Sequence, residues 1–162
     1  MTLQVRSRLR QLRPHGLDGM NLREAITELV YGSRLKAEGV VIEALVPDTL
    51  PRLSADAGLA LYRTVQEALT NVLRHARAAR VRVVIALQGQ GVQMTLDDDG
   101  NGRAPEVLRK ARAGVMGMRE RASMAGGRFE LGVAPLGGLR VLLWLPLAAS
   151  QTGEGNGECA AA

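Results

Sequence analysis

The chain has 162 residues, of which 46% are hydrophobic and 2% are aromatic, which fits one globular domain with a core of aliphatic side chains. The net charge is +5, but the arginines are scattered and lack aromatic neighbours, so the composition argues against nucleic-acid binding. The single cysteine, Cys159, excludes an intrachain disulfide and fits a reducing compartment. No apolar run approaches the roughly 20 residues that span a bilayer, and the charged N-terminus does not resemble a secretory signal, so we expect a cytoplasmic location.

The apolar spacing and the positions of glycine and proline predict the elements in chain order. They are a short amphipathic helix over residues 3–12, a loop over 14–19, a helix from Asn21 to about Glu38, a strand over 40–46, a helix that opens at Ser54 and runs beyond residue 76, strands over 79–87 and 92–96, a short helix over 105–112, a helix over 114–125, and strands over 127–133 and 139–147. Asn21 and Glu24 have the spacing of a capping box, and Gly39 is suited to end that helix. The turn over 88–91 predicts a hairpin, and residues 150–162 are predicted to be a disordered tail.

Consecutive strands joined by short turns favour a mixed, mostly antiparallel sheet over a doubly wound parallel one. We therefore expect an α+β fold, a two-layer α/β sandwich with the helices on one face of the sheet. We expect residues 21–148 to form the functional domain, residues 1–20 to be an N-terminal helix and linker, and residues 149–162 to be a tail.

The helix after Ser54 carries a polar stripe made of Glu67, Asn71, Arg74 and His75. Residues three or four apart share a helix face, so a carboxylate, an amide, a guanidinium and an imidazole line one side. An amide oxygen can bind a nucleotide-associated Mg²⁺, a carboxylate can take a proton, and the basic groups can meet phosphates. Each residue alone would more often be part of a solvated surface.

Two glycine-rich segments follow the polar stripe in the chain. In residues 97–102, a carboxylate such as Asp98 can accept a hydrogen bond from an adenine amine, and the glycines allow close approach of the backbone. In residues 114–122, glycines at a helix start leave N–H groups free to hold phosphate. Either segment alone is a weak signal, since acidic turns and glycine-led helices are common.

Together these motifs resemble the C-terminal ATP-binding domain of two-component sensor histidine kinases, in the subgroup that serves NarL-type response regulators. Residues 66–76 are similar to the N-box of that family, residues 98–102 to its first glycine box and residues 114–118 to its second. Gly126-Gly127 and the final Leu145-Pro146 are also typical. The resemblance implies the Bergerat ATP-binding fold, with ATP and Mg²⁺ as cofactors.

The resemblance implies a role for each matched residue. Asn71 would bind Mg²⁺, Glu67 would assist phosphoryl transfer, Arg74 and His75 would lie near the phosphates, and Asp98 would hold the adenine amine. The remaining matches would shape the pocket and its lid over residues 103–113, and they are Gly100, Gly102, Gly114, Gly117 and Met118.

Two departures from the family pattern are present. Leu139 stands where the family usually has a threonine that supports the adenine carboxylate, so one hydroxyl is lost. Residues 9–22 resemble the end of the second dimerisation helix, but the first helix with its phosphoacceptor histidine is not in the chain, and His15 lies in a loop. We therefore expect a monomeric fragment that binds ATP without phosphorylating itself.

The resemblance implies a kinase whose parent is a homodimer, with an anchor in the inner membrane as one option. The parent would transfer the γ-phosphoryl group of ATP to a histidine and then to a NarL-type response regulator. Two alternatives stay open. One is a serine kinase of the anti-sigma-factor type, and the other is a degenerate regulatory module that no longer turns ATP over.

Overall fold

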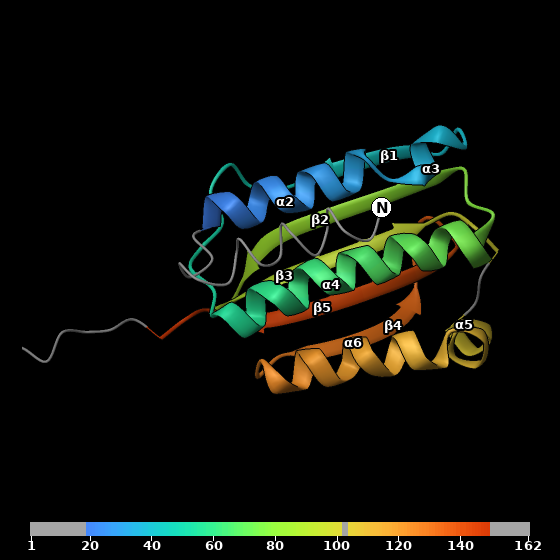
Figure 1. Cartoon of the computed structure of the whole chain (residues 1–162). Coiled ribbons are helices and arrows are strands. Elements are labelled where there is room, and N and C mark those ends of the chain that lie inside the picture. Colours follow the sequence, from blue (N-terminus) through green and yellow to red (C-terminus); the bar gives the residue numbers. More distant parts are fainter. Residues whose placement is uncertain (1–18, 102–103, 150–162) are drawn as a thin grey trace, which may run out of the picture.

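The computed structural model describes residues 19–101 and 104–149 (Figure 1). Its helices are α2 (Gly19–Tyr31), α3 (Arg34–Ala37), α4 (Ala55–Asn71), the π-helix η1 (Val72–Ala76), α5 (Ala104–Lys110) and α6 (Arg112–Met124). Its strands are β1 (Val41–Leu45), β2 (Arg80–Gln88), β3 (Gly91–Asp98), β4 (Arg128–Val133) and β5 (Leu139–Pro146). The predicted helix over residues 3–12, most of the loop after it, Gly102 and the tail over 150–162 lie outside the described residues, so the predicted domain boundaries stay predictions.

The strands form one mixed sheet in the spatial order β1-β2-β3-β5-β4. β1 runs parallel to β2, because the connection between them crosses over through α4, and the other neighbouring pairs are antiparallel. Gly89 and Gln90 form the two-residue turn between β2 and β3, and the φ of +60° at Gly89 explains why glycine occupies its first position. The sheet confirms the predicted mixed, mostly antiparallel arrangement and the predicted hairpin.

Helices α2, α4 and α6 lie side by side over one face of the sheet (Figure 1). Helix α4 is central because it contacts both α2 and α6, and Ser54 begins it by accepting a hydrogen bond from the Ala57 N–H at 3.1 Å. Its buried side chains recur every three or four residues, and they include Ala57, Leu61, Val65 and Ala68. They pack on the inward-facing aliphatic residues of β2, β3 and β5, which makes the two-layer sandwich.

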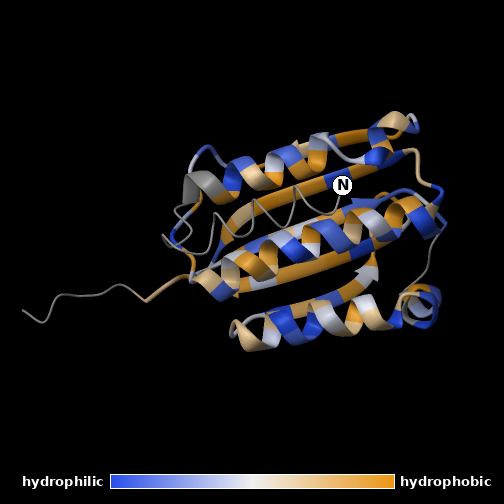
Figure 2. Cartoon of the chain, viewed as in Figure 1, coloured by the Kyte–Doolittle hydropathy of each residue, from blue (hydrophilic) through white to orange (hydrophobic). Residues whose placement is uncertain are grey.

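Hydropathy follows these two layers (Figure 2). The central strands are largely hydrophobic, whereas the helices over them alternate between hydrophobic and hydrophilic positions. Within the described part of the chain, no helix combines the length and the apolar content that crossing a bilayer would require.

The predicted helix from Asn21 to Glu38 is wrong in two respects. The structure divides it into α2 and α3, because the chain leaves the helical path at Ser33, where φ is −69° and ψ is 150°. Gly32 makes the last hydrogen bond to the Glu28 carbonyl at 2.8 Å, and glycine and serine are weak helix formers. Asn21 lies inside α2 rather than at its N-cap, since α2 begins at Gly19. Gly39 does follow the second helix as predicted, with a φ of +82°.

Candidate functional site

A small cavity lies where α4 and η1 meet β3 and β5, and α5 contributes one wall. Its lining residues are Ala68, Asn71, Val72, His75, Ala76, Leu96, Asp98, Val107, Leu139 and Val141. The cavity volume is about 10 Å³, which is room for about one water molecule. Its walls are mostly apolar, with an amide, an imidazole and a carboxylate among them, which is the usual composition of a small-molecule site.

Asp98 is the carboxylate of this cavity, and only 1% of the residue is exposed. Its Oδ1 accepts hydrogen bonds from the Gly100 N–H at 2.8 Å and from the Leu139 N–H at 3.3 Å. Among the described residues no donor is hydrogen-bonded to its Oδ2. The backbone therefore holds one oxygen of this carboxylate in place.

The surroundings of Asp98 disfavour its charged form. Burial raises the pKa of the Asp98 carboxyl above its ordinary value. The N–H groups of Gly100 and Leu139 lower that pKa and offset part of the rise, whereas the neighbouring charges of Asp99 and Asp97 add to it. The net effect is a raised pKa, which the two backbone donors partly oppose.

Two glycines around Asp98 are required by close packing. A Cβ at Gly138 would overlap Asp98 Oδ1, and a Cβ at Gly100 would overlap the Ala76 carbonyl oxygen. Gly138 was not among the predicted site residues, although it directly precedes Leu139. The lost threonine hydroxyl at position 139 leaves the backbone donor intact, because the Leu139 N–H still reaches the carboxylate.

The polar stripe is divided between α4 and η1. Asn71 is the last residue of α4 and only 7% exposed, and both it and His75 line the cavity. The helix widens to a π-helix over Val72–Ala76 and ends at Arg77, which adopts the left-handed conformation with φ 48°. Single-turn π segments are common at functional sites. Arg74 is exposed and does not line the cavity.

Glu67 lies one turn before Asn71, against the start of α6. A Cβ at Gly114 would come within 3.1 Å of the Glu67 carboxylate, so glycine allows the two helices this approach. Helix α6 begins at Arg112, two residues before the predicted start, so Gly114 is still in its first turn and its N–H lacks an i−4 partner within the helix. A carboxylate at this position is favoured by the helix dipole.

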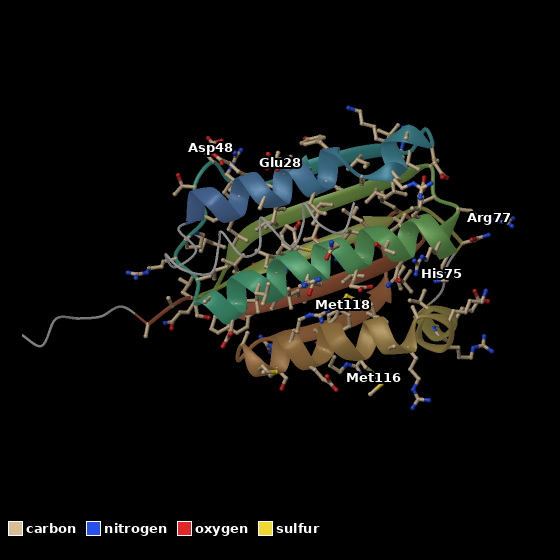
Figure 3. The ribbon with its side chains drawn as sticks, in the orientation of Figure 1. Glu28, Asp48, His75, Arg77, Met116 and Met118 are labelled. Atoms are coloured by element: carbon tan, nitrogen blue, oxygen red, sulfur yellow. The ribbon has the colours of Figure 1, made fainter. Side chains whose placement is uncertain are left out.

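The other predicted residues lie further away. Met118 is fully buried beneath α4, whereas Met116 on the same helix is exposed and points outward (Figure 3). A Cβ at Gly117 would come within 3.3 Å of the Arg121 guanidinium, and Gly117 does not line the cavity. Of the predicted set, Asn71, His75 and Asp98 line the cavity, and Gly100 is hydrogen-bonded to Asp98. Glu67 lies on α4 and Gly114, Gly117 and Met118 lie on α6, which packs on α4, whereas Arg74 is exposed and Gly102 lies outside the described residues.

Sequence reasoning missed the apolar walls and two supporting acids. Val107 on α5 is only 3% exposed, and it lines the cavity. Asp97 pairs with Arg140, and Asp99 accepts two backbone hydrogen bonds. The pairing of Asp97 and Arg140 could not be read from the chain, because it depends on the register between β3 and β5.

The described residues contain no group of three or more His, Cys, Asp or Glu side chains that could hold a metal ion. Asn71 lines the cavity, and its amide oxygen could supply one ligand to a metal ion whose other ligands are waters or phosphate oxygens, which is a common arrangement for Mg²⁺.

Comparison with known proteins identifies the same region of the chain. Residues 56–149 match the family model described as histidine kinase-, DNA gyrase B- and HSP90-like ATPase. The sensor histidine kinase LiaS of Bacillus subtilis is 32% identical over 151 residues, which cover 93% of this chain and 41% of LiaS. UhpB of Salmonella typhimurium, a signal transduction histidine-protein kinase/phosphatase, is 34% identical over 144 residues, covering 88% of this chain and 28% of UhpB. The chain thus spans less than half of these relatives.

Solved structures share the fold. The ATP-binding domain of PrrB from Mycobacterium tuberculosis superposes with a TM-score of 0.62 at 22% identity, covering 79% of this chain and 95% of that domain. The mycobacterial sensor histidine kinase MprB has the same TM-score of 0.62 at 20% identity, covering 76% of this chain and 92% of that chain. The family match spans more than half of the sequence and includes the cavity, the polar stripe and the turn that carries Asp98. The chain belongs to the family of histidine kinase-, DNA gyrase B- and HSP90-like ATPases.

Proposed function

We propose that this chain is the catalytic domain of a sensor histidine kinase, which binds Mg·ATP and delivers its γ-phosphoryl group to a histidine. The observation that carries the proposal is the buried Asp98, which has one oxygen held by two N–H groups and the other left as an acceptor beside Asn71 and His75. Relatives named as histidine kinases, which align with about nine-tenths of the chain, support it.

In this proposal Asp98 selects the base. Its Oδ2 accepts a hydrogen bond from the exocyclic amine of adenine, and the apolar side chains of Leu96, Leu139 and Val141 contact the ring. An acceptor fixed in a mostly apolar wall discriminates strongly between bases. A base with a carbonyl in place of the adenine amine would leave the carboxylate without a donor.

Asn71 would hold the metal ion and Glu67 would act beside it. When bound, Mg²⁺ neutralises phosphate charge. The Asn71 side chain is buried at the cavity wall, where its amide oxygen can be a ligand. Glu67, one turn earlier, can accept a proton or orient water, while His75 contacts phosphate oxygens and Arg74 reaches them from the rim. Phosphoryl transfer depends mainly on such positioning and charge stabilisation.

The remaining predicted residues would serve the lid. Gly114 lets α6 approach Glu67 closely, Gly117 leaves room for the Arg121 side chain of the same helix, Met118 anchors α6 in the core, and Gly100 shapes the turn after Asp98. The cavity of about 10 Å³ is too small for a purine. Nucleotide entry in this proposal therefore requires α5 to move and withdraw Val107.

We extend the proposal to partners of the parent protein. The phosphoacceptor would be a histidine on a dimerisation helix of a homodimeric kinase, and the phosphoryl group would pass to a NarL-type response regulator. Residues 1–20 would belong to the dimerisation helix and linker, residues 21–148 to the ATP-binding domain and residues 149–162 to a tail. The chain alone would be monomeric and cytoplasmic, with the parent anchored in the inner membrane as one arrangement.

Calorimetric titration with a nonhydrolysable ATP analogue, with and without Mg²⁺, tests the nucleotide site. We expect Mg²⁺-assisted binding by the intact chain, loss of binding in Asp98→Asn and loss of the Mg²⁺ effect in Asn71→Ala. Glu130→Gln is a matched control, because Glu130 is exposed on β4, outside the cavity lining. Absence of binding by the intact chain would favour a regulatory module without nucleotide.

Transfer is tested separately with radiolabelled ATP and a dimerisation-helix protein supplied in trans. We expect acid-labile, base-stable label on its histidine, as phosphohistidine chemistry requires. Label on serine instead would favour the anti-sigma-factor type of kinase, and no label despite nucleotide binding would reject the histidine kinase activity.

A further inference from the structure

Three consecutive aspartates, the last two residues of β3 and the residue that follows, have carboxylates in three different environments. Asp98 faces the cavity. Asp97 lies on the opposite face of the sheet, where Arg140 donates to both of its oxygens at 2.7 Å. Asp99 lies just past the strand, where it contacts the loop that connects η1 to β2. The cavity acid is thus flanked by two acids that make contacts with other parts of the chain.

Asp99 makes a compact set of backbone contacts. Its Oδ1 accepts hydrogen bonds from the Ala79 N–H and the Arg80 N–H, both at 2.8 Å. Its own N–H donates to the Arg80 carbonyl at 3.2 Å. One side chain therefore joins the start of β2 to the turn that follows β3.

The loop that Asp99 contacts contains a residue with an unfavourable backbone conformation. It leaves the π-helix through Arg77, whose φ of 48° is uncommon and unfavourable for a residue with a side chain. Such a conformation persists only where surrounding contacts determine it. The two N–H groups bound by Asp99 come directly after this turn, so the hydrogen bonds of its carboxylate are well placed to hold Arg77 in this conformation.

The same turn is tied to η1 by a second contact. The Asn101 N–H donates to the Ala76 carbonyl at 2.8 Å, and Gly100 packs directly on that carbonyl group. Between these two attachments lies the Gly100 N–H, which donates to Asp98 Oδ1. The direction of the Asp98 carboxylate therefore depends on how the turn is attached on both sides.

We infer that Asp99 is a positioning residue, which fastens the turn over 98–101 to the η1–β2 loop and thereby orients Asp98 toward the base. The inference rests on the proposed function, because it concerns the nucleotide contact of Asp98. Asp99 acts through its acceptor oxygen, since both contacts are hydrogen bonds from neutral N–H groups.

Three substitutions separate this role from a charge effect. Asp99→Ala removes the acceptor, and we expect the affinity for the nonhydrolysable ATP analogue to fall about tenfold or more. Asp99→Asn retains an acceptor oxygen in the same position, and we expect affinity within about threefold of the parent. Asp99→Glu retains the charge but displaces the oxygens by one methylene, so we expect it to resemble the alanine variant.

Amide hydrogen exchange measured by NMR provides a readout that needs no ligand. In Asp99→Ala we expect faster exchange at Ala79 and Arg80, which lose their acceptor, and also at Gly100 and Leu139, which report on Asp98. Exchange in the core of α4 should not change. A purely structural role would instead accelerate exchange throughout the sheet. If Asp99→Ala does not fold, Asp99→Asn and Asp99→Glu are compared instead, because the first keeps the acceptor oxygen in place and the second displaces it.

The outcomes separate the two proposals. If the intact chain binds no nucleotide, the proposed function fails, and the exchange at Gly100 and Leu139 still decides whether Asp99 orients Asp98. If the chain binds nucleotide and a folded Asp99→Ala binds equally well with unchanged exchange at those two amides, the positioning role is rejected. Equal weakening by Asp99→Asn and Asp99→Ala would also reject it, because charge rather than the acceptor would then be responsible.

Discussion

Asp98 is so deeply buried that ionisation of its carboxylate lowers the stability of the fold. Its pKa is raised by burial, so the folded chain binds the Asp98 proton more tightly than the unfolded chain does. Between the ordinary pKa and the raised one, the folded state holds more protons, and the free energy of unfolding falls as pH rises. Above that window the ionised group therefore destabilises the fold.

Asp98→Asn should therefore increase the free energy of unfolding at pH 7 while abolishing nucleotide binding. The amide oxygen can still accept from Gly100 and Leu139, but its NH₂ group would face the adenine amine, donor against donor. Urea denaturation at pH 7, beside calorimetric titration, measures both quantities. A variant less stable than the parent would contradict this explanation, because stability would then require the charge.

Nucleotide affinity should depend on the ionisation of the same group. A protonated Asp98 is a poorer acceptor for the adenine amine, so we expect the affinity to fall as pH decreases through the raised pKa of Asp98. Titrations with the ATP analogue at a series of pH values above the acid unfolding range would measure this. The phosphates of the ligand also titrate, so a parallel series with inorganic triphosphate serves as the control. The same pH dependence for both ligands would argue against Asp98.

The ion pair behind the cavity supports the strands that carry Asp98 and Leu139. Arg140 and Asp97 are direct partners across β3 and β5, and the Asp97 side chain is only 5% exposed. Arg140→Met would leave that carboxylate buried without its charged donor, which should cost about 2–4 kcal/mol of unfolding free energy. Adding Asp97→Leu should recover much of the loss, since it removes the unpaired charge. A double-mutant cycle by urea denaturation measures the coupling, and a small coupling energy would contradict this view.

At the scale of elements, α5 is held to the domain partly through Val107, which packs into the cavity. Val107→Ala removes two methyl groups from this contact, worth about 1–2 kcal/mol. We expect faster amide exchange in α5, with α2 unchanged, and tighter binding of the ATP analogue because less apolar contact must be broken. Weaker binding would mean that Val107 contacts the base in the complex instead of being displaced by it.

The elements themselves were largely predictable because each carries local signals. The period of apolar residues in α4, its Ser54 cap and the glycine turn between β2 and β3 are local, and all three appear where the sequence indicated. The break between α2 and α3 was missed, because the apolar pattern continues across it through Leu35, which is buried like the residues before it. Periodicity reports burial and cannot show that the backbone has left the helix at Ser33.

The site was only partly predictable, because residue types and spacings can be read locally and tertiary contacts cannot. Asn71, His75 and Asp98 were identified by residue type and spacing, and the fold brings them to one cavity. The contacts that orient them depend on tertiary register. Nothing local in the sequence indicates that Asp99 meets Ala79 and Arg80, or that Val107 lines the cavity.

At the scale of the molecule, the two faces of the sheet serve different purposes. The face under the helices is aliphatic, whereas a row of alternating charges crosses four strands of the other face through Glu43, Arg82, Asp97 and Arg140. Arg82 lies 3.5 Å from Glu43, and Arg140 is 2.7 Å from Asp97. This arrangement gives each of the four charged side chains a partner of opposite sign on the face away from the helices.

Because the cavity involves α4, β3, β5 and α5 together, a ligand bound there should stabilise the whole domain rather than one segment. A ligand at 100 times its dissociation constant adds about 2.7 kcal/mol to the free energy of unfolding. For a domain of this size that corresponds to a rise in Tm of about 5–10 °C. We expect this rise with the ATP analogue and Mg²⁺ in thermal denaturation, and none with Asp98→Asn, while Glu130→Gln should behave as the parent. Calorimetry that shows two separate transitions in the presence of ligand would contradict the prediction, because the ligand would then stabilise only part of the fold.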